Sequence, residues 1–240
     1  MTYRYLTDLA DVLRDAGLPV VELPGWQTRG RPASTGGFDP VGNLWHHTGG
    51  TANTREYAEW MALTGRSDLP APLCQVAIDR DGVCYVSAAG RANHGGTAKP
   101  AGPVPGGDAN ELYIGWECMN TGGEGWEPPQ YDAMVVAAAA TSRHYGWDAD
   151  ANRAHRETSY TGKWDPGLLA MPEFRADIAV LMEDDMPLND ADLEKIRALV
   201  HDEIAQAGTT IKVANPLDDG KKPKWTLEAI LQRTFKRAGE

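Results

Sequence analysis

Apolar residues recur along the chain in two patterns, one typical of helices and one typical of short strands. Helical spacing predicts helices over residues 5–16, 54–64, 130–145 and 172–183. Short apolar runs predict strands over residues 42–48, 73–78, 83–87 and 113–119. An Asp81-Gly82 turn joins the second and third strands, and Asp-Gly is a strong hairpin signal. Residues 24–42 and 95–110 are predicted to be loops, and residues 146–170 to be mostly irregular.

The helix predicted over residues 54–64 has one apolar face. This face is expected to turn inward, and its members are Tyr57, Trp60, Met61 and Leu63.

The character of the chain changes near residue 185, where an acidic run is followed by Pro187. Beyond it, Asn189 is placed to cap the first of two amphipathic helices. Their apolar positions are Leu193, Ile196, Val200 and Ile204, then Leu227, Ile230, Leu231 and Phe235. We therefore predict a larger domain over residues 1–184 and a small helical segment over residues 185–240.

Composition narrows the range of partners and compartments. The formal net charge of −11 argues against nucleic acid as a partner, because phosphate binding favours a basic surface. No run approaches the ~20 apolar residues that span a bilayer, and the N-terminus lacks the apolar core of a signal peptide. We therefore expect no membrane insertion, and we expect synthesis in the cytoplasm. The sparse cysteines Cys74, Cys84 and Cys118 are expected to be buried, reduced thiols.

Histidine and aspartate residues in two separated runs suggest a metal centre. His46 and His47 end one predicted strand, and adjacent strand residues point to opposite faces, so one of the pair is expected to reach a given metal. His155 and Asp165 lie in a polar stretch about a hundred residues later. Two imidazoles and a carboxylate form the ligand set of an open catalytic zinc site. This combination indicates a hydrolase.

Three further residues are candidates for chemistry or for substrate contact. Glu117 is a carboxylate in an apolar strand, where desolvation raises the pKa toward the range of a general base. Lys163 stands two positions before Asp165, so on an extended segment both side chains share a face. His94 opens a Gly-rich loop and is expected to contact substrate or line a cleft. Simpler interpretations stay open: a solvated Lys163, a turn-forming Asp165 and a solvent-facing Glu117.

The order of these motifs resembles a known family. A strand ending in His46-His47-Thr48, an Asp-Gly hairpin, Ala92-Asn93-His94-Gly95, the strand Ile114-Gly115-Trp116-Glu117 and the run from His155 to Gly167 follow one another over roughly residues 40–180. This arrangement is similar to the type-2 N-acetylmuramoyl-L-alanine amidases, whose fold is shared with peptidoglycan-recognition proteins. The resemblance implies an α/β fold with a central mixed β-sheet flanked by helices.

The resemblance also implies a role for each residue. The metal ligands would be His46, His155 and Asp165, holding Zn²⁺. Apart from the resemblance, His47 and His94 are expected to bind substrate. The target would be the amide between N-acetylmuramic acid and L-alanine. Glu117 would take a proton from water and pass it to the leaving amine, and Lys163 would stabilise the oxyanion.

The biological setting implied is that of a bacteriophage endolysin. Such a protein is made in the host bacterial cytoplasm and acts on peptidoglycan after release. Alternatives are a non-catalytic peptidoglycan-binding protein, a cytosolic amidase that recycles muropeptides, and a structural or regulatory role. Residues 185–240 would attach to the wall, form a homo-oligomer through their helices, or cap the catalytic domain.

Overall fold

The computed structural model describes residues 2–184. The chain divides into two units, Met1–Asp184 and Asp185–Glu240, and only the first is treated below. The predicted C-terminal helices, with their apolar stripes, lie outside the described residues. The predicted domain boundary therefore stays a prediction.

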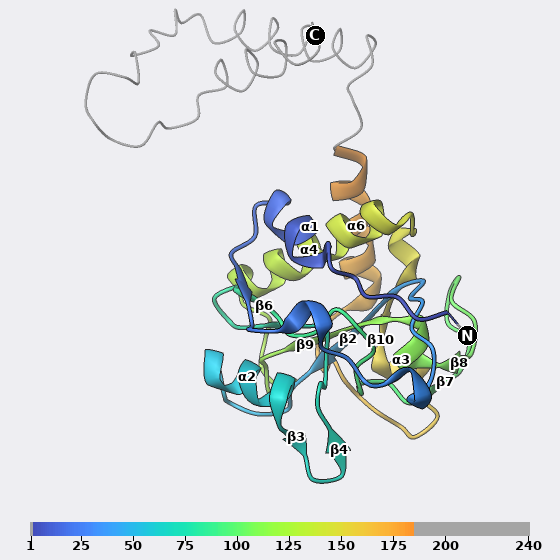
Figure 1. Ribbon diagram of the computed structural model, residues 1–240. Coiled ribbons are helices and arrows are strands. Elements are labelled where there is room, and N and C mark those ends of the chain that lie inside the picture. The colour runs from blue at the N-terminus through green and yellow to red at the C-terminus, as the bar shows by residue number, and fades with distance from the viewer. Residues whose placement is uncertain (1, 185–240) are drawn as a thin grey trace, which may run out of the picture. The chain divides into compact units, whose positions relative to one another are not determined.

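A six-stranded mixed sheet forms the centre of the fold (Figure 1). Its strands, in spatial order, are β1 (Val20–Glu22), β6 (Cys84–Val86), β5 (Val76–Ile78), β9 (Ile114–Cys118), β2 (Asn43–His47) and β10 (Asn152–Ala154). Only the β5–β6 pair is antiparallel, and the other neighbours run parallel. The two longest strands of this sheet, β2 and β9, are neighbours in its interior, and all their residues are buried except Glu117, which is partly exposed.

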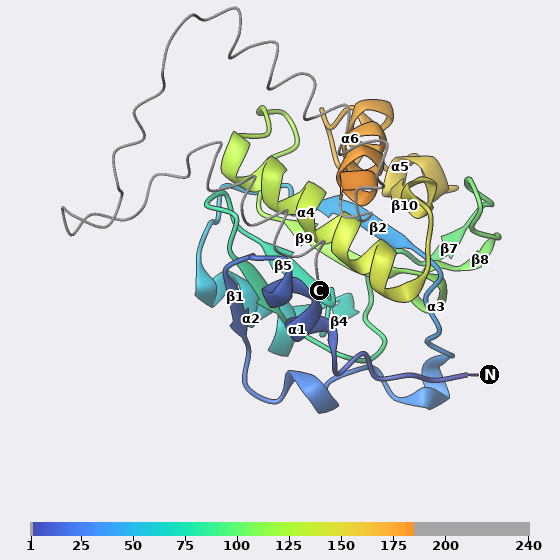
Figure 2. The same ribbon diagram turned by 90° about the horizontal axis from the view of Figure 1, so that it is seen from above.

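Helices cover both faces of this sheet (Figures 1 and 2). On one face lie α1 (Leu9–Asp15), α4 (Pro128–Tyr145) and α6 (Met171–Asp184). On the other face, α2 (Arg55–Leu63) packs its buried Ala58 and Met61 against Ala77 and Tyr85. The predicted fold class, an α/β domain with a central mixed sheet flanked by helices, is confirmed.

The core beneath α4 and α6 is built on aromatic side chains. Trp45 of β2 stacks on Trp116 of β9 with ring centroids 4.8 Å apart. The edge of Phe174 from α6 meets the Trp45 ring at 5.2 Å. Gly146 ends α4 in the left-handed conformation (φ 77°), which a glycine adopts without steric cost. The small alanine side chains on the buried face of α4 let this helix lie close to the sheet.

Short elements complete the described part of the chain. They are the 3₁₀ turns Trp26–Thr28, Ala33–Thr35 and Ala149–Ala151, the hairpin β3 (Gly65–Arg66) and β4 (Leu69–Pro70), the pair β7 (Thr97–Ala98) and β8 (Gly107–Asp108), and the helices α3 (Ala109–Leu112) and α5 (His155–Thr158). Residues 146–170, predicted as mostly irregular, thus contain both β10 and α5. The prediction holds for most of this range, but it did not include β10, because backbone pairing with β2 makes a strand of three residues that carry no apolar run.

The predicted inward face of α2 is correct only in part. Met61 is buried, and Tyr57 and Trp60 are half-buried with their rings stacked 5.4 Å apart. Leu63 is 63% exposed, because it is the last residue of the helix and lies beyond the contact with the sheet.

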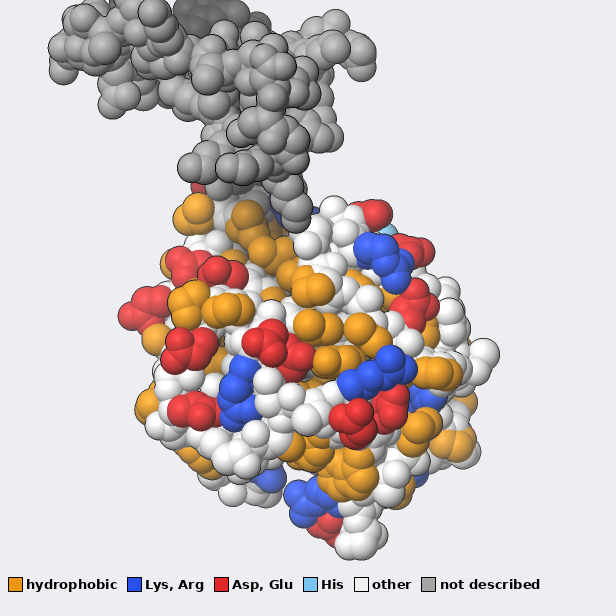
Figure 3. Space-filling view, turned by 90° about the vertical axis from the view of Figure 1, so that its left-hand side faces the viewer, with side chains coloured by type: hydrophobic (Ala, Val, Ile, Leu, Met, Phe, Trp, Pro, Cys, Tyr) orange, Lys and Arg blue, Asp and Glu red, His pale blue; other side chains and the backbone are white. Residues whose placement is uncertain are grey.

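The charged surface and the state of the cysteines are as the composition predicts. On the face drawn in Figure 3, acidic and basic side chains are interspersed among apolar ones. Within residues 2–184, no helix combines the length and the apolar character needed to cross a bilayer. Cys74, Cys84 and Cys118 are buried and free, as predicted.

Candidate active site

Along β2 and β9, successive side chains point to opposite faces of the sheet, so one residue belongs to the core and the next to the site. Trp45 and Trp116 are register partners that pack beneath α4 and α6. The next residues, His46 and Glu117, are also register partners and point to the opposite face. Backbone pairing of two central strands therefore sets the distance between this imidazole and this carboxylate.

Asp165 brings the two predicted histidine ligands together. Its Oδ2 atom lies 2.8 Å from Nδ1 of His46 and 3.0 Å from Nδ1 of His155. The ligand atoms of the three residues all lie within 4.8 Å of one another. Two imidazole nitrogens that converge on one carboxylate oxygen fit the donor chemistry of a zinc ion, so this group could hold a metal.

Local structure fixes the segment that carries His155 and Asp165. His155 is the first residue of α5, and the Glu157 carboxylate accepts the Ala154 N–H at that helix start. The Arg156 N–H donates to the Asp165 carbonyl at 2.9 Å, and its guanidinium donates to the Gly167 carbonyl at 2.8 Å. Asp165 is thus brought back beside His155, ten residues earlier in the chain.

The electrostatics of the site separate its two carboxyl groups. Burial, together with the charge of Asp165, raises the pKa of Glu117 to about 8, although Lys163 acts in the other direction. Burial would also raise the pKa of Asp165, but hydrogen bonds from His155 and His46 outweigh it and hold that pKa well below its usual range. Burial lowers the pKa of His46 to about 4, so its imidazole is neutral at physiological pH. A neutral imidazole is the form that binds a metal.

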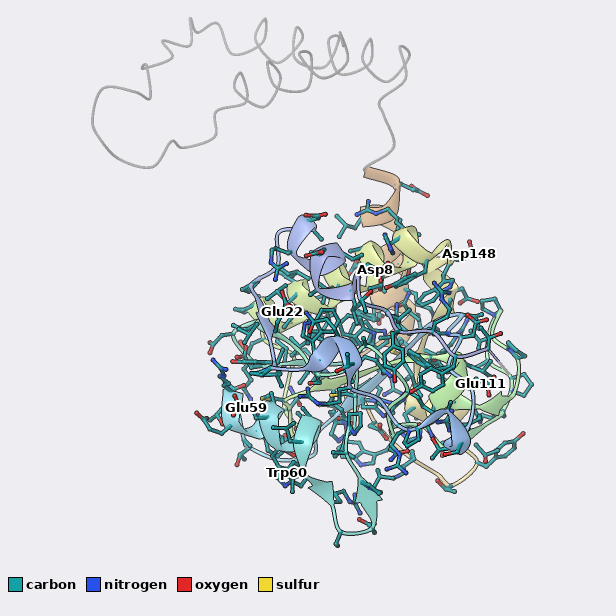
Figure 4. The ribbon with its side chains drawn as sticks, in the orientation of Figure 1. Asp8, Glu22, Glu59, Trp60, Glu111 and Asp148 are labelled. Carbon is teal, nitrogen blue, oxygen red and sulfur yellow. The ribbon has the colours of Figure 1, made fainter. Side chains whose placement is uncertain are left out.

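A cleft of about 290 Å³ opens beside this group. Its lining combines the candidate residues with an aromatic and aliphatic wall. The lining residues are His47, Thr48, Tyr57, Trp60, Met61, Arg66, Leu69, Leu73, Asn93, Glu117, His155, Lys163, Trp164 and Asp165. Figure 4 shows Trp60 on α2, on the side of the molecule that carries the β3–β4 hairpin. Lys163 and Glu117 thus face one shared space from a loop and from the sheet.

The two residues assigned to substrate binding occupy different positions. His47 lines the cleft, and its ring meets that of Trp164 edge to face at 4.6 Å. His94 is not among the cleft-lining residues, and its Nδ1 lies 3.3 Å from Nε2 of His46. His94 therefore contacts a candidate metal ligand.

Several cleft residues were not singled out as site candidates by the sequence. Trp164 stands between Lys163 and Asp165 and is 55% exposed, so its position inside the motif was a usable signal. Trp60 was assigned to the core by its helical spacing. Arg66 belongs to a hairpin of two-residue strands, for which the sequence carries no periodic signal.

Comparison with known proteins identifies the family of this fold and site. The family model described as N-acetylmuramoyl-L-alanine amidase matches residues 39–168, more than half of the chain. The matched segment includes His46, Glu117, His155, Lys163 and Asp165. No curated protein matches the chain in sequence.

Solved structures with a similar fold cover most of the described residues. The PlyG catalytic domain has a TM-score of 0.51 at 16% identity, over 70% of this chain and 96% of that one. PlyL has a TM-score of 0.50 at 16% identity, over 67% of this chain and 96% of that one. The endolysin amidase LysCS from Clostridium intestinale URNW has a TM-score of 0.49 at 17% identity, over 66% and 94%. At these identities the likeness concerns the fold.

Proposed function

Because the chain belongs to the N-acetylmuramoyl-L-alanine amidase family, we propose that it is a zinc-dependent hydrolase acting in host lysis. The family gives the reaction class, hydrolysis of an amide in peptidoglycan. The bond cleaved is that between the lactyl group of N-acetylmuramic acid and L-alanine. The observation that carries the proposal is the convergence of His46, His155 and Asp165, whose ligand atoms lie within 4.8 Å of one another.

His46, His155 and Asp165 would hold the zinc ion. When bound, zinc supplies Lewis acidity, which polarises the scissile carbonyl and makes water a better nucleophile at neutral pH. Asp165 is ionised over the whole working range of pH, because hydrogen bonds from both imidazoles keep its pKa low. The carboxylate can therefore offset part of a cation's charge without a competing proton.

Glu117 is the proposed general base and acid. Its carboxyl group lies on the cleft wall, on the strand next to that of His46, and its raised pKa allows it to hold a proton between two transfers. It takes the proton from the attacking water and returns it to the amine of L-alanine as that group leaves. Both transfers occur at one side chain fixed by strand pairing.

Lys163 is the proposed stabiliser of the oxyanion. It lines the same cleft as Glu117 and lies in the segment between α5 and α6. An ammonium at this place favours the negative charge that develops on the carbonyl oxygen. Removing a group that stabilises an oxyanion typically costs ~10²–10³ in rate.

The proposed biological role is that of a bacteriophage endolysin acting on the wall after release from the cytoplasm. The motif order supports this role, and so does the composition of residues 185–240, which provides a candidate for wall attachment or for self-association. Neither nucleic acid nor a membrane is a proposed partner, consistent with the net charge of −11.

Metal analysis and cleavage assays of the full chain and of two variants test the proposal. The full chain should contain about one zinc ion, a chelator should abolish cleavage, and added zinc should restore it. Mass spectrometry of digested peptidoglycan should show free L-alanine amino termini. Cleavage at another bond, or full activity after metal removal, would contradict the proposal. His46→Ala should lose zinc, whereas His47→Ala should retain most of it as a matched control.

A further inference from the structure

The two ring nitrogens of His46 face different partners. Nδ1 lies 2.8 Å from Asp165 Oδ2, within the proposed metal group. Nε2 lies 3.3 Å from Nδ1 of His94, with the two rings edge to face and their centroids 5.4 Å apart. Among the described residues, no other side chain makes a hydrogen bond to the His94 ring. The contact with His46 is therefore the side-chain hydrogen bond of this buried imidazole, which also interacts with the Tyr113 backbone.

The surrounding backbone is shaped to keep His94 at this place. The N–H groups of His94 and Gly95 both donate to the Asn110 side-chain oxygen at 2.8 Å. On strand β9, a Cβ at Gly115 would lie 2.5 Å from the His94 ring. Only glycine fits there without displacing the ring, so a residue of the central sheet is small to make room for it.

A metal bound at Nδ1 of His46 would determine where the proton of that imidazole lies. A neutral imidazole that gives the Nδ1 lone pair to a metal carries its proton on Nε2. Ligand histidines hold their orientation and basicity best when that proton has a fixed acceptor. Within residues 2–184, the side-chain atom within hydrogen-bond distance of His46 Nε2 is His94 Nδ1, and accepting a proton there requires the His94 proton to be on its own Nε2.

We propose that His94 is a positioning residue, whose Nδ1 accepts the Nε2 proton of His46 and so fixes the tautomer and orientation of that ligand. The proposal rests on the proposed zinc site and assigns His94 a role behind the ligand, outside the substrate cleft. The proposal also explains why His94 stands in the Gly-rich loop and why a glycine, Gly115, stands next to it on β9.

Zinc affinity of the full chain tests this role, measured by competition with a chromophoric chelator. His94→Leu and His94→Asn are nearly equal in shape, but only Asn keeps an acceptor near the place of Nδ1. We expect His94→Leu to weaken zinc binding about 10–100-fold and His94→Asn to stay within about fivefold of the parent. His144→Leu removes an exposed histidine paired with Asp8 and should leave zinc affinity unchanged.

The outcomes separate this role from the zinc site itself. Parent-like affinity in His94→Leu overturns the positioning role, and so do equal losses in Leu and Asn, because packing would then explain both. A parent protein that binds no zinc, or a His46→Ala variant that binds it normally, contradicts the zinc site instead. If the variants do not fold, heteronuclear NMR of the zinc-loaded parent decides. His94 should be protonated at Nε2, and a proton on its Nδ1 overturns the proposal.

Discussion

At the scale of single residues, Glu117 and Asp165 share one cleft but differ in what surrounds their carboxyl groups. Asp165 accepts hydrogen bonds from two imidazoles, which lower its pKa, whereas desolvation on the cleft wall raises the pKa of Glu117 to about 8. Two carboxyl groups with pKa values driven apart are suited to different tasks. One is suited to hold a cation, and the other to exchange protons.

This difference predicts distinct losses for the two substitutions. Glu117→Gln should retain zinc and fold but lose about 10²–10⁴ in kcat, because the amide cannot accept a proton. Asp165→Asn should lose zinc affinity as well as activity. Metal analysis and turnover of a soluble muropeptide check both variants. Turnover near the parent rate in Glu117→Gln would mean that another group is the base.

The raised pKa of Glu117 also predicts a pH dependence of stability in the metal-stripped protein. The folded state binds the Glu117 proton more tightly than the unfolded state, whose carboxyl keeps the ordinary value of 4.5. Stability is therefore greatest below pH 4.5 for this group and falls as the pH rises toward about 8. We expect thermal melts to show a loss of a few kcal/mol that Glu117→Gln abolishes. An equal loss in that variant would assign the effect to other groups.

At the scale of elements, sequence periodicity was informative where a strand or helix buries an apolar face. The runs around β2 and β9 and the periodicity of α4 predicted these elements within two residues. In β10, by contrast, Asn152 and Arg153 are buried polar residues. Asn152 accepts hydrogen bonds from the distant Asn43 and Trp45 side chains, whereas Arg153 pairs with the nearby Asp150. A strand that satisfies polar groups through tertiary contacts leaves no apolar pattern to read.

The site was predictable from the sequence to a similar extent. His46, His155 and Asp165 were expected as a group because their residue types match a metal ligand set, and they do lie together. The contact of His94 with His46 was not foreseen, since it depends on the space left by Gly115 across the sheet. The cleft wall on the β3–β4 hairpin likewise depends on how that hairpin packs.

Asn43 links the elements that carry the site. Its side chain donates to Thr141 and Asn152 at 3.0 Å each and accepts from the Trp116 indole at 2.8 Å. Asn43→Leu would leave the buried Trp116 indole N–H without this acceptor and would remove two further buried hydrogen bonds, so we expect a loss of about 2–4 kcal/mol in unfolding free energy. Thr141→Val removes one of the bonds and should cost about 1 kcal/mol. Chemical denaturation measures both, and equal stability of Asn43→Leu and the parent would contradict the role.

Trp164 offers an aromatic face to whatever occupies the cleft. It lines the cleft beside Lys163 and is 55% exposed. Trp164→Ala should raise KM for a soluble muropeptide about 5–30-fold with a smaller change in kcat, and Trp164→Phe should retain most of the affinity. The exposed Leu168 is a control on the same segment outside the cleft lining, and Leu168→Ala should leave KM unchanged.

At the scale of the whole molecule, the described residues contain a complete sheet, its helical layers and the metal group. A chain ending near residue 184 should therefore fold, bind zinc and cleave small soluble muropeptides at close to the parent rate. On intact walls it should be slower, through lost attachment or lost dimer avidity. Light scattering of both chains distinguishes these causes. Insolubility or loss of zinc in the shorter chain would show that residues 185–240 belong to the catalytic domain.

The proposed ligands differ in how the chain holds them. His46 belongs to β2, which is paired with β9 on one side and β10 on the other, so it can leave the site only if the central ladder opens. Asp165 lies in the segment between α5 and α6, which is held by single backbone bonds such as Leu168 N–H to the Gly122 carbonyl at 3.1 Å. Local opening costs less free energy there than in a central strand. Metal loss and reloading should then proceed by displacement of the aspartate segment, which would let the enzyme exchange its ion with the surroundings while the rest of the fold stays protected from proteases.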